Sequence, residues 1–271
     1  MELVVVMVIL IALAGMLLPL FPNMLNRAHT SSSATSGAEL SKAIQTYQAL
    51  YYTYPNLLDN LVIGTSTFSY LLGFDNSPSG NLYVGTLTDG TDAALSNVGL
   101  NYAAQVAAAA TAANGTGSVP VYNPTFFPYN AIPALTYSAA TSTSAAITTP
   151  IGAGTTLTSG MSVAMLGTQS IADLALTQGA SYVVFGVGSY TTMSGKTIDD
   201  APVHFDDDPT ANPNLAYARF GVLFQVTDYT GAALPQALYA GAVSFHPLSD
   251  GGVVGTDAHI EEYFNNISVS N

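Results

Sequence analysis

The sequence contains no cysteine and very few basic residues. Its 271 residues include 4 Lys and Arg against 17 Asp and Glu, which gives a formal net charge of −13. Without cysteine, the chain forms no disulfide and offers no thiolate to a metal, a haem or a catalytic mechanism. Four cations are too few for a basic patch, so a nucleic-acid-binding role is not expected.

Charge of either sign is scarce. Charged residues make up 8% of the chain, against about 25% in an ordinary soluble domain. The hydrophobic fraction of 49% is normal, and the length suits one or two domains with a real core. Because aromatic and β-branched residues are plentiful, the acidity indicates a soluble surface rather than disorder.

The chain opens with a long apolar run. Residues 3–22 read LVVVMVILIALAGMLLPLFP, and no charged residue occurs from Leu3 to Asn26. A helix of about 20 residues is about 30 Å long, the thickness of a bilayer core. A signal peptide fits poorly, because the only early charge is the acidic Glu2. A carboxylate beside such a segment needs a partner, which would belong to another chain.

This run resembles the N-terminal segment of bacterial type IV pilins and type II secretion pseudopilins. That family has a glutamate, an apolar helix and a proline seventeen residues after the glutamate, and Glu2 and Pro19 stand at this spacing. In the family the mature chain starts a few residues before the glutamate, whereas only Met1 precedes Glu2 here. Either the leader and a few mature residues are missing from this sequence, or the processing differs, and we expect the former.

A second part of the resemblance lies in residues 38–62. Apolar residues there follow the spacing of one helix face, namely Leu40, Ile44, Tyr47 and Tyr51. Tyr54-Pro55 is expected to end the helix, since proline cannot continue it. Members of the family often show a helix that ends in Tyr-Pro and is followed by spaced leucines, which here are Leu57, Leu58 and Leu61.

The resemblance implies an α+β, pilin-like fold, with a long N-terminal hydrophobic spine helix and then a globular head containing an antiparallel β-sheet. We expect a membrane or filament-core helix at 1–29, an amphipathic second half of the spine helix at 30–60, and a Ser/Thr/Gly-rich, β-containing head at 61–271. Residues 29–37 read HTSSSATSG and are poor helix formers. They are either the exposed middle of one long helix or a flexible joint.

Residue patterns in the head predict its elements. Alanine propensity favours a helix over 101–113, and a short helix is expected over 171–177. Segments rich in β-branched and aromatic residues predict strands within 181–187, 217–229 and 238–246, with a turn at 228–231.

Acidic residues gather in one part of the head. Asp206 and Asp208 are the first candidates for a calcium site, and Asp199 and Asp200 the next, because calcium prefers hard oxygen ligands. Some pseudopilins hold calcium in a head loop, although the spacing here is not that of an EF-hand. The alternative is a solvated acidic loop, or Asp side chains that cap turns. No other cofactor is expected.

The segment 136–160 is of low complexity, with 12 Ser or Thr among 25 residues. It is either a long surface loop or weak edge strands, or an O-glycosylated patch with Thr141, Ser142, Thr143 and Ser144 as the candidate acceptors.

We do not expect an enzyme. The sequence has neither a G-x-S-x-G elbow nor an H-E-x-x-H motif, and its four histidines are scattered.

The resemblance implies a structural subunit, a major pilin, of an extracellular type IV pilus-like filament with an adhesion, motility or surface role. A helix that is apolar on every side must be buried in lipid or among copies of itself. Glu2 would pair with the N-terminal amine of a neighbouring subunit. Gly15, Pro19 and Pro22 would allow the helix to unwind locally in the filament, since proline removes backbone donors.

The implied partners are other copies of the chain, the inner-membrane assembly machinery and a prepilin peptidase. The chain would be anchored in the inner membrane before assembly and would lie at the cell surface afterwards. Two alternatives stay open. One is a pseudopilin of a type II secretion system, which shares every motif above. The other is a membrane-tethered exported enzyme or binding protein.

Overall fold

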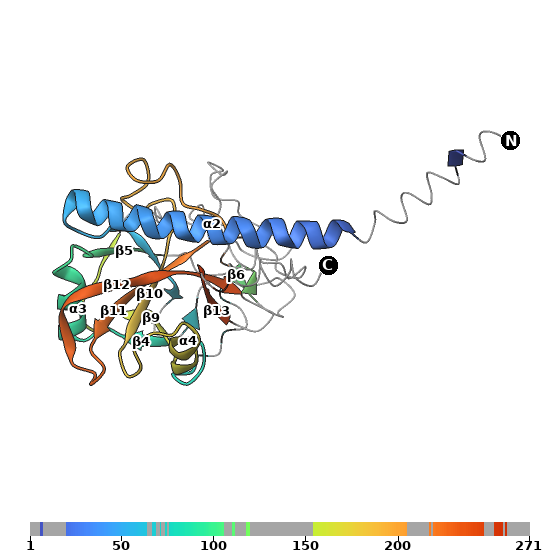
Figure 1. The fold of residues 1–271 in the computed structure, drawn as a ribbon. Coiled ribbons are helices and arrows are strands. Elements are labelled where there is room, and N and C mark those ends of the chain that lie inside the picture. The colour runs from blue at the N-terminus through green and yellow to red at the C-terminus, as the bar shows by residue number, and fades with distance from the viewer. Residues whose placement is uncertain are drawn as a thin grey trace.

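The computed structural model describes residues 6–7, 20–63, 67–68, 71, 74, 76–105, 110–111, 118–119, 154–204, 217, 219–246, 252–256 and 258. In these ranges a large β-sheet is covered by helices (Figure 1). The helices are α2 (Leu20–Tyr51), α3 (Asp89–Ser96) and α4 (Thr168–Asp173).

Within the described residues, nine strands form the main sheet: β1 (Leu58–Asn60), β4 (Leu82–Thr86), β5 (Tyr102–Gln105), β8 (Thr155–Thr156), β9 (Ser162–Leu166), β10 (Tyr182–Gly186), β11 (Gly221–Thr227), β12 (Ala233–His246) and β13 (Gly252–Gly255). Two small antiparallel pairs lie outside it: β2 (Val62–Ile63) with β3 (Thr67–Phe68), and β6 (Ala110–Thr111) with β7 (Ser118–Val119).

The sheet is mixed, and it forks at β10. Its main path runs β13-β12-β11-β10-β1-β5-β8. Strands β1 and β9 both pair with β10, since Gly186 lies opposite Asp59 and Val183 lies opposite Met165. Strand β4 then extends the β9 branch. The pairing of β1 with β5 is parallel, and the other ladders of the described sheet are antiparallel.

The expected fold class is therefore wrong. The sequence predicted a long hydrophobic spine helix followed by an antiparallel head, whereas a nine-stranded mixed sheet dominates the described part of the chain. Among the described residues, no helix combines the length and the apolar character that crossing a membrane requires. Helix α2 instead packs on the sheet, chiefly on β12 (Figure 1).

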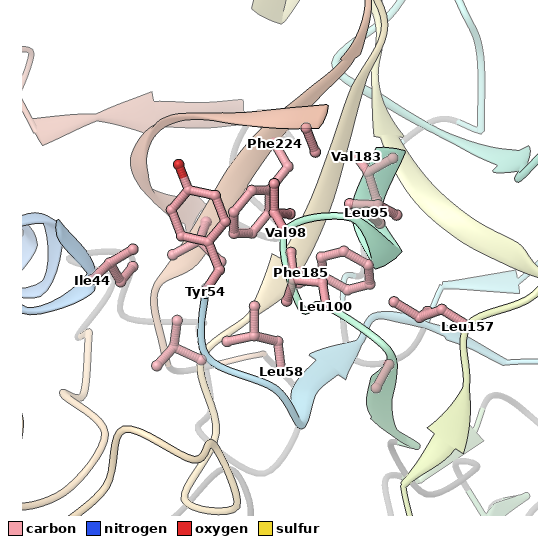
Figure 2. Close-up of a cluster of buried hydrophobic side chains, with 14 of the residues drawn as sticks. Ile44, Tyr54, Leu58, Leu95, Val98, Leu100, Leu157, Val183, Phe185 and Phe224 are labelled. Carbon is pink, nitrogen blue, oxygen red and sulfur yellow. The ribbon is translucent and has the colours of Figure 1, made fainter. Parts of the chain in front are cut away.

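Strict alternation along the central strands builds a separate core on each face of the sheet. In β10, Val183 and Phe185 join one core, while Tyr182 and Val184 join the other. The first core also takes side chains from α2 and α3, and Figure 2 shows Ile44 in the same cluster as Phe185 and neighbouring apolar residues. A strand that is apolar at every position is buried on both faces, as β10 is.

Residues 29–37 are not a flexible joint but part of one long helix, as the first interpretation expected, although several of them are buried rather than exposed. They are helical, and α2 continues through them and through the expected boundary at residues 29 and 30. Thr30, Ser33 and Ala34 are buried. At Gly37 a Cβ atom would lie 2.7 Å from Thr256 Oγ1, so glycine allows close approach of the helix to the chain after β13. Small side chains are therefore what this contact requires.

The predicted strands and turn of the head are confirmed, and the predicted short helix is confirmed only in part. The strands within 181–187, 217–229 and 238–246 are confirmed by β10, β11 and β12. The turn at 228–231 is also confirmed, because Asp228 Oδ1 accepts hydrogen bonds from the backbone of Thr230 and Ala232. Helix α4 ends earlier than the predicted 171–177.

The helix predicted over 101–113 is wrong. Strands β5 and β6 occupy parts of this range. Ala103 and Ala104 are buried in the sheet, and Ala103 lies opposite Leu58 of β1. Pairing with a distant strand has overridden the helical preference of alanine.

Candidate functional site

The region most unlike an ordinary core is a group of buried polar side chains where the sheet forks. Asp59 of β1 is fully buried, and so is Arg219, which precedes β11. Tyr217 is 1% exposed, and its hydroxyl donates a hydrogen bond of 2.8 Å to Asp59 Oδ2. We call Asp59, Tyr217 and Arg219 the buried polar cluster. Charges in such a place need partners, because leaving water costs several kcal/mol for each ion.

Glycines make room for this cluster. A Cβ atom at Gly186 would lie 1.9 Å from the Tyr217 hydroxyl oxygen. A Cβ atom at Gly188 would lie 2.4 Å from Asp59 Oδ2. Both positions therefore exclude larger residues, and the end of β10 is shaped around the Asp59–Tyr217 hydrogen bond.

The cluster strongly favours the neutral phenol. Burial raises the pKa of Tyr217 well above its ordinary value of 10.0, and the negative charge and hydrogen bond of Asp59 raise it further. The positive charge of Arg219 acts in the opposite direction on the same pKa. The phenol thus stays protonated and remains a donor to Asp59 at neutral pH.

Arg219 closes a loop. Its Nη1 donates to the carbonyl oxygen of Ala201 at 2.7 Å, and its Nη2 donates to Ser189 Oγ at 3.0 Å. One guanidinium therefore holds together the two ends of the segment 189–201, which we call the clamped loop. The planar fork of arginine suits two such bonds, whereas lysine offers a single ammonium group.

The clamped loop docks onto the end of α2 and the residues after it. Thr192 donates its backbone N–H to the carbonyl of Asn56 at 3.0 Å, and its Oγ1 accepts the N–H of Asn56 at 2.9 Å. The same Oγ1 lies 3.1 Å from the Tyr47 hydroxyl. The Lys196 ammonium stands over the rings of Tyr47 and Tyr51, 5.4 Å and 4.8 Å from their centroids.

Further polar contacts fix the rest of α2. Ser33 Oγ lies 3.0 Å from His204 Nδ1 in a buried position. The His204 ring neighbours that of His246, with centroids 5.2 Å apart. Nearer the end of the helix, the Tyr239 hydroxyl of β12 donates to Ser41 Oγ at 2.9 Å. Helix α2 is thus held at three points along its length: by His204, by Tyr239 of β12 and by Thr192 of the clamped loop.

The buried polar cluster is suited to a structural role, and its three side chains are not accessible to a substrate. A carboxylate, a phenol and a guanidinium stand close together, yet each is at most 1% exposed and none of them faces water. A catalytic group must come within hydrogen-bond reach of a substrate atom. What the cluster can do is fix the clamped loop, and through the loop the end of α2.

Most of the sites predicted from the sequence lie outside the described residues. This holds for Glu2, Gly15 and Pro19, for Asp206 and Asp208, and for the candidate glycosylation sites Thr141, Ser142, Thr143 and Ser144. Pro22 falls within α2.

The second pair of predicted calcium ligands is described. Asp199 and Asp200 are both exposed at the end of the clamped loop, and Asp200 Oδ1 accepts the backbone N–H of Ala201 at 2.7 Å. In the described ranges, no three His, Asp or Glu residues gather as a metal would need. Calcium at Asp206 and Asp208 stays a prediction.

The sequence reasoning missed the buried polar cluster and the Ser33–His204 contact. A signal was present for two of these residues. Asp59 and Arg219 are single charges inside otherwise apolar stretches, LLDNLV and YARFGVLF, in a chain with few charges. Such residues are seldom fully buried unless they are paired.

The chain matches no protein-family model, and neither the curated proteins nor the solved structures give a match to it.

Proposed function

We propose that this chain is a structural subunit of an extracellular helical filament that assembles in the manner of type IV pilins. The observation that carries the proposal is the uncharged apolar run from Leu3 to Asn26. A segment of this kind requires burial in lipid or among copies of itself. Val6 and Met7, its described residues outside α2, are helical and each 55% exposed in the single chain. Their exposure supports burial against another molecule.

The attachment of the run to the folded body also supports the proposal. The last residues of the run lie in α2, which begins at Leu20. Contacts at Ser33, Ser41 and Tyr47 then hold this helix on the rest of the folded chain. A body fixed to its apolar segment would be carried into a defined position when that segment is buried. The mixed sheet itself does not enter the proposal.

In the proposed assembly, Glu2 pairs with the N-terminal amine of a neighbouring subunit. A carboxylate left without a partner in an apolar filament core would cost several kcal/mol, so only subunits in register are added. Repeated head-to-tail contacts that do not close into a ring give a helical polymer. The subunit has no catalytic role in this account.

A Glu2→Ala variant of the full chain tests the proposal. We expect the yield of filaments sheared from producing cells to fall at least about tenfold, which corresponds to about 1.4 kcal/mol per contact. Glu39→Ala is the matched control, because Glu39 is an exposed carboxylate on α2. Equal yields from Glu2→Ala and the parent chain would contradict the proposal, and so would a parent chain that forms no filaments.

A further inference from the structure

Helix α2 ends in a run of exposed apolar side chains. Ala49, Leu50, Tyr51 and Tyr52 are four consecutive exposed residues, and the last three are 63%, 45% and 90% exposed. Folded proteins rarely leave such a run uncovered unless it has a function, and exposed apolar patches mark sites of interaction.

Tyr52 has an unfavourable backbone conformation. Its φ of 58° places it in the left-handed region, where glycine and asparagine are the usual residues after a helix. A bulky residue there costs of order 1 kcal/mol, and the 90% exposed ring of Tyr52 gains little from the rest of the chain in return. Strain combined with exposure indicates that the aromatic ring acts outside the chain.

The groups beside Tyr52 contact one another. The rings of Tyr47 and Tyr51 lie 4.5 Å apart, and the Lys196 ammonium covers both. Lys196 belongs to the clamped loop, whose ends Arg219 holds together. Aromatic side chains that are ordered before binding lose little entropy when they bind, which is why they dominate protein interfaces.

We propose that Leu50, Tyr51, Tyr52 and Lys196, the Tyr52 patch, form a contact surface for a second copy of this chain. The inference rests on the proposed function, since it names a contact between subunits of the filament. It places this contact at the C-terminal end of α2, opposite the end that leads to the apolar run (Figure 1). Two different contact surfaces on one subunit give a head-to-tail arrangement, as an open polymer requires.

Charge complementarity favours another copy as the occupant. Within the described residues, the Lys196 ammonium contacts the two tyrosine rings and forms no ion pair. A partner with exposed carboxylates would complete this contact. The chain itself has 17 Asp and Glu residues, and it exposes acidic side chains such as Asp89 and Asp173. Opposite charges at an interface promote the correct encounter and orientation.

Photocrosslinking in producing cells tests the inference. The full chain carries p-benzoylphenylalanine in place of Tyr52 or, as a second probe, in place of Leu50. The control carries it in place of Tyr229, a 72% exposed tyrosine in the turn between β11 and β12. We expect an adduct of twice the chain mass, identified by peptide sequencing as this chain joined to itself, and at least about tenfold less of it from position 229.

Charge reversal adds an independent test. Lys196→Glu should lower the yield of the self-adduct several-fold. Tyr52→Asn should lower the filament yield. It should leave the midpoint temperature of thermal unfolding unchanged or raise it slightly, because asparagine accepts the left-handed conformation. Absence of the self-adduct from both probes, or an adduct with a different protein, would overturn the inference. If filaments form but neither probe gives a self-adduct, the contact at the Tyr52 patch is rejected and the proposed function stands. A self-adduct without filaments would support the contact and reject the filament.

Discussion

The Tyr217 hydroxyl donates a 2.8 Å hydrogen bond to Asp59, although the two residues are 158 positions apart in the sequence. This bond joins the strand that follows α2 to the segment leading into β11. It also explains why Gly186 and Gly188 carry no side chain, since a Cβ atom at either would collide with one of the partners. The cluster around it decides where the clamped loop lies.

Removing the phenol should destabilise the fold. Tyr217→Phe leaves Asp59 buried without this donor, and hydrogen bonds to charged groups contribute about 1.5–3 kcal/mol. We expect a loss of this size in the free energy of unfolding, measured with urea on the full chain in detergent. Tyr229→Phe, at an exposed turn, should change it by less than about 0.5 kcal/mol. An equal, small effect of both changes would contradict a structural role for the pair.

Replacing the guanidinium should loosen the clamped loop selectively. Arg219→Lys keeps the charge but cannot present the fork that reaches both Ser189 and Ala201. We expect amide hydrogen exchange in residues 189–201 to rise at least about tenfold, with a smaller rise in β12. Lys42→Arg on the exposed face of α2 is the control. Unchanged exchange in the loop of the Arg219→Lys variant would show that the clamp is unimportant.

The close approach of α2 to the sheet should make Gly37 intolerant of bulk. Gly37→Leu forces a side chain toward Thr256 and Phe220, and overpacking costs about 1–3 kcal/mol. Ala38→Leu adds the same kind of side chain one residue later, on the exposed face. The free energy of unfolding, measured by thermal unfolding, should therefore fall for Gly37→Leu and should change by less than about 0.5 kcal/mol for Ala38→Leu. The reverse order would mean that the helix docks through another face.

Tyr239 should make the fold sensitive to alkali. Burial raises its pKa from 10.0 to about 12, so the folded chain holds this proton more tightly than the unfolded chain. The associated stability is complete below pH 10 and is lost as the pH rises from 10 to about 12, at up to about 1.4 kcal/mol per pH unit. Tyr239→Phe cannot ionise and should show a shallower loss. Urea unfolding across this range measures both slopes, and identical slopes would contradict the assignment.

How far the sequence predicts this fold depends on the range of the interactions. Strands β10, β11 and β12 follow from their apolar, β-branched composition, because that signal is local. The helical face predicted from spacing is confirmed for Leu40, Ile44 and Tyr47, which are buried, whereas its fourth residue, Tyr51, is 45% exposed.

The misread segments depend on distant partners. Residues 29–37 look like poor helix formers, yet they meet Thr256 and His204, which lie more than 150 positions later. The alanines of β5 look helical, yet they pair with β1 in parallel. Nothing in the local sequence reports these contacts. The candidate site could not be predicted from the local sequence either, because the role of Arg219 depends on where Ser189 and Ala201 lie in space.

The most direct test of the filament proposal is electron microscopy of material sheared from producing cells, with its protein identified by mass spectrometry. The account predicts long filaments made of this chain, in which residues 3–26 are buried at the centre and the sheet faces outwards. A chain that stays with the cell envelope while the sheared fraction contains no filaments of it would contradict the account.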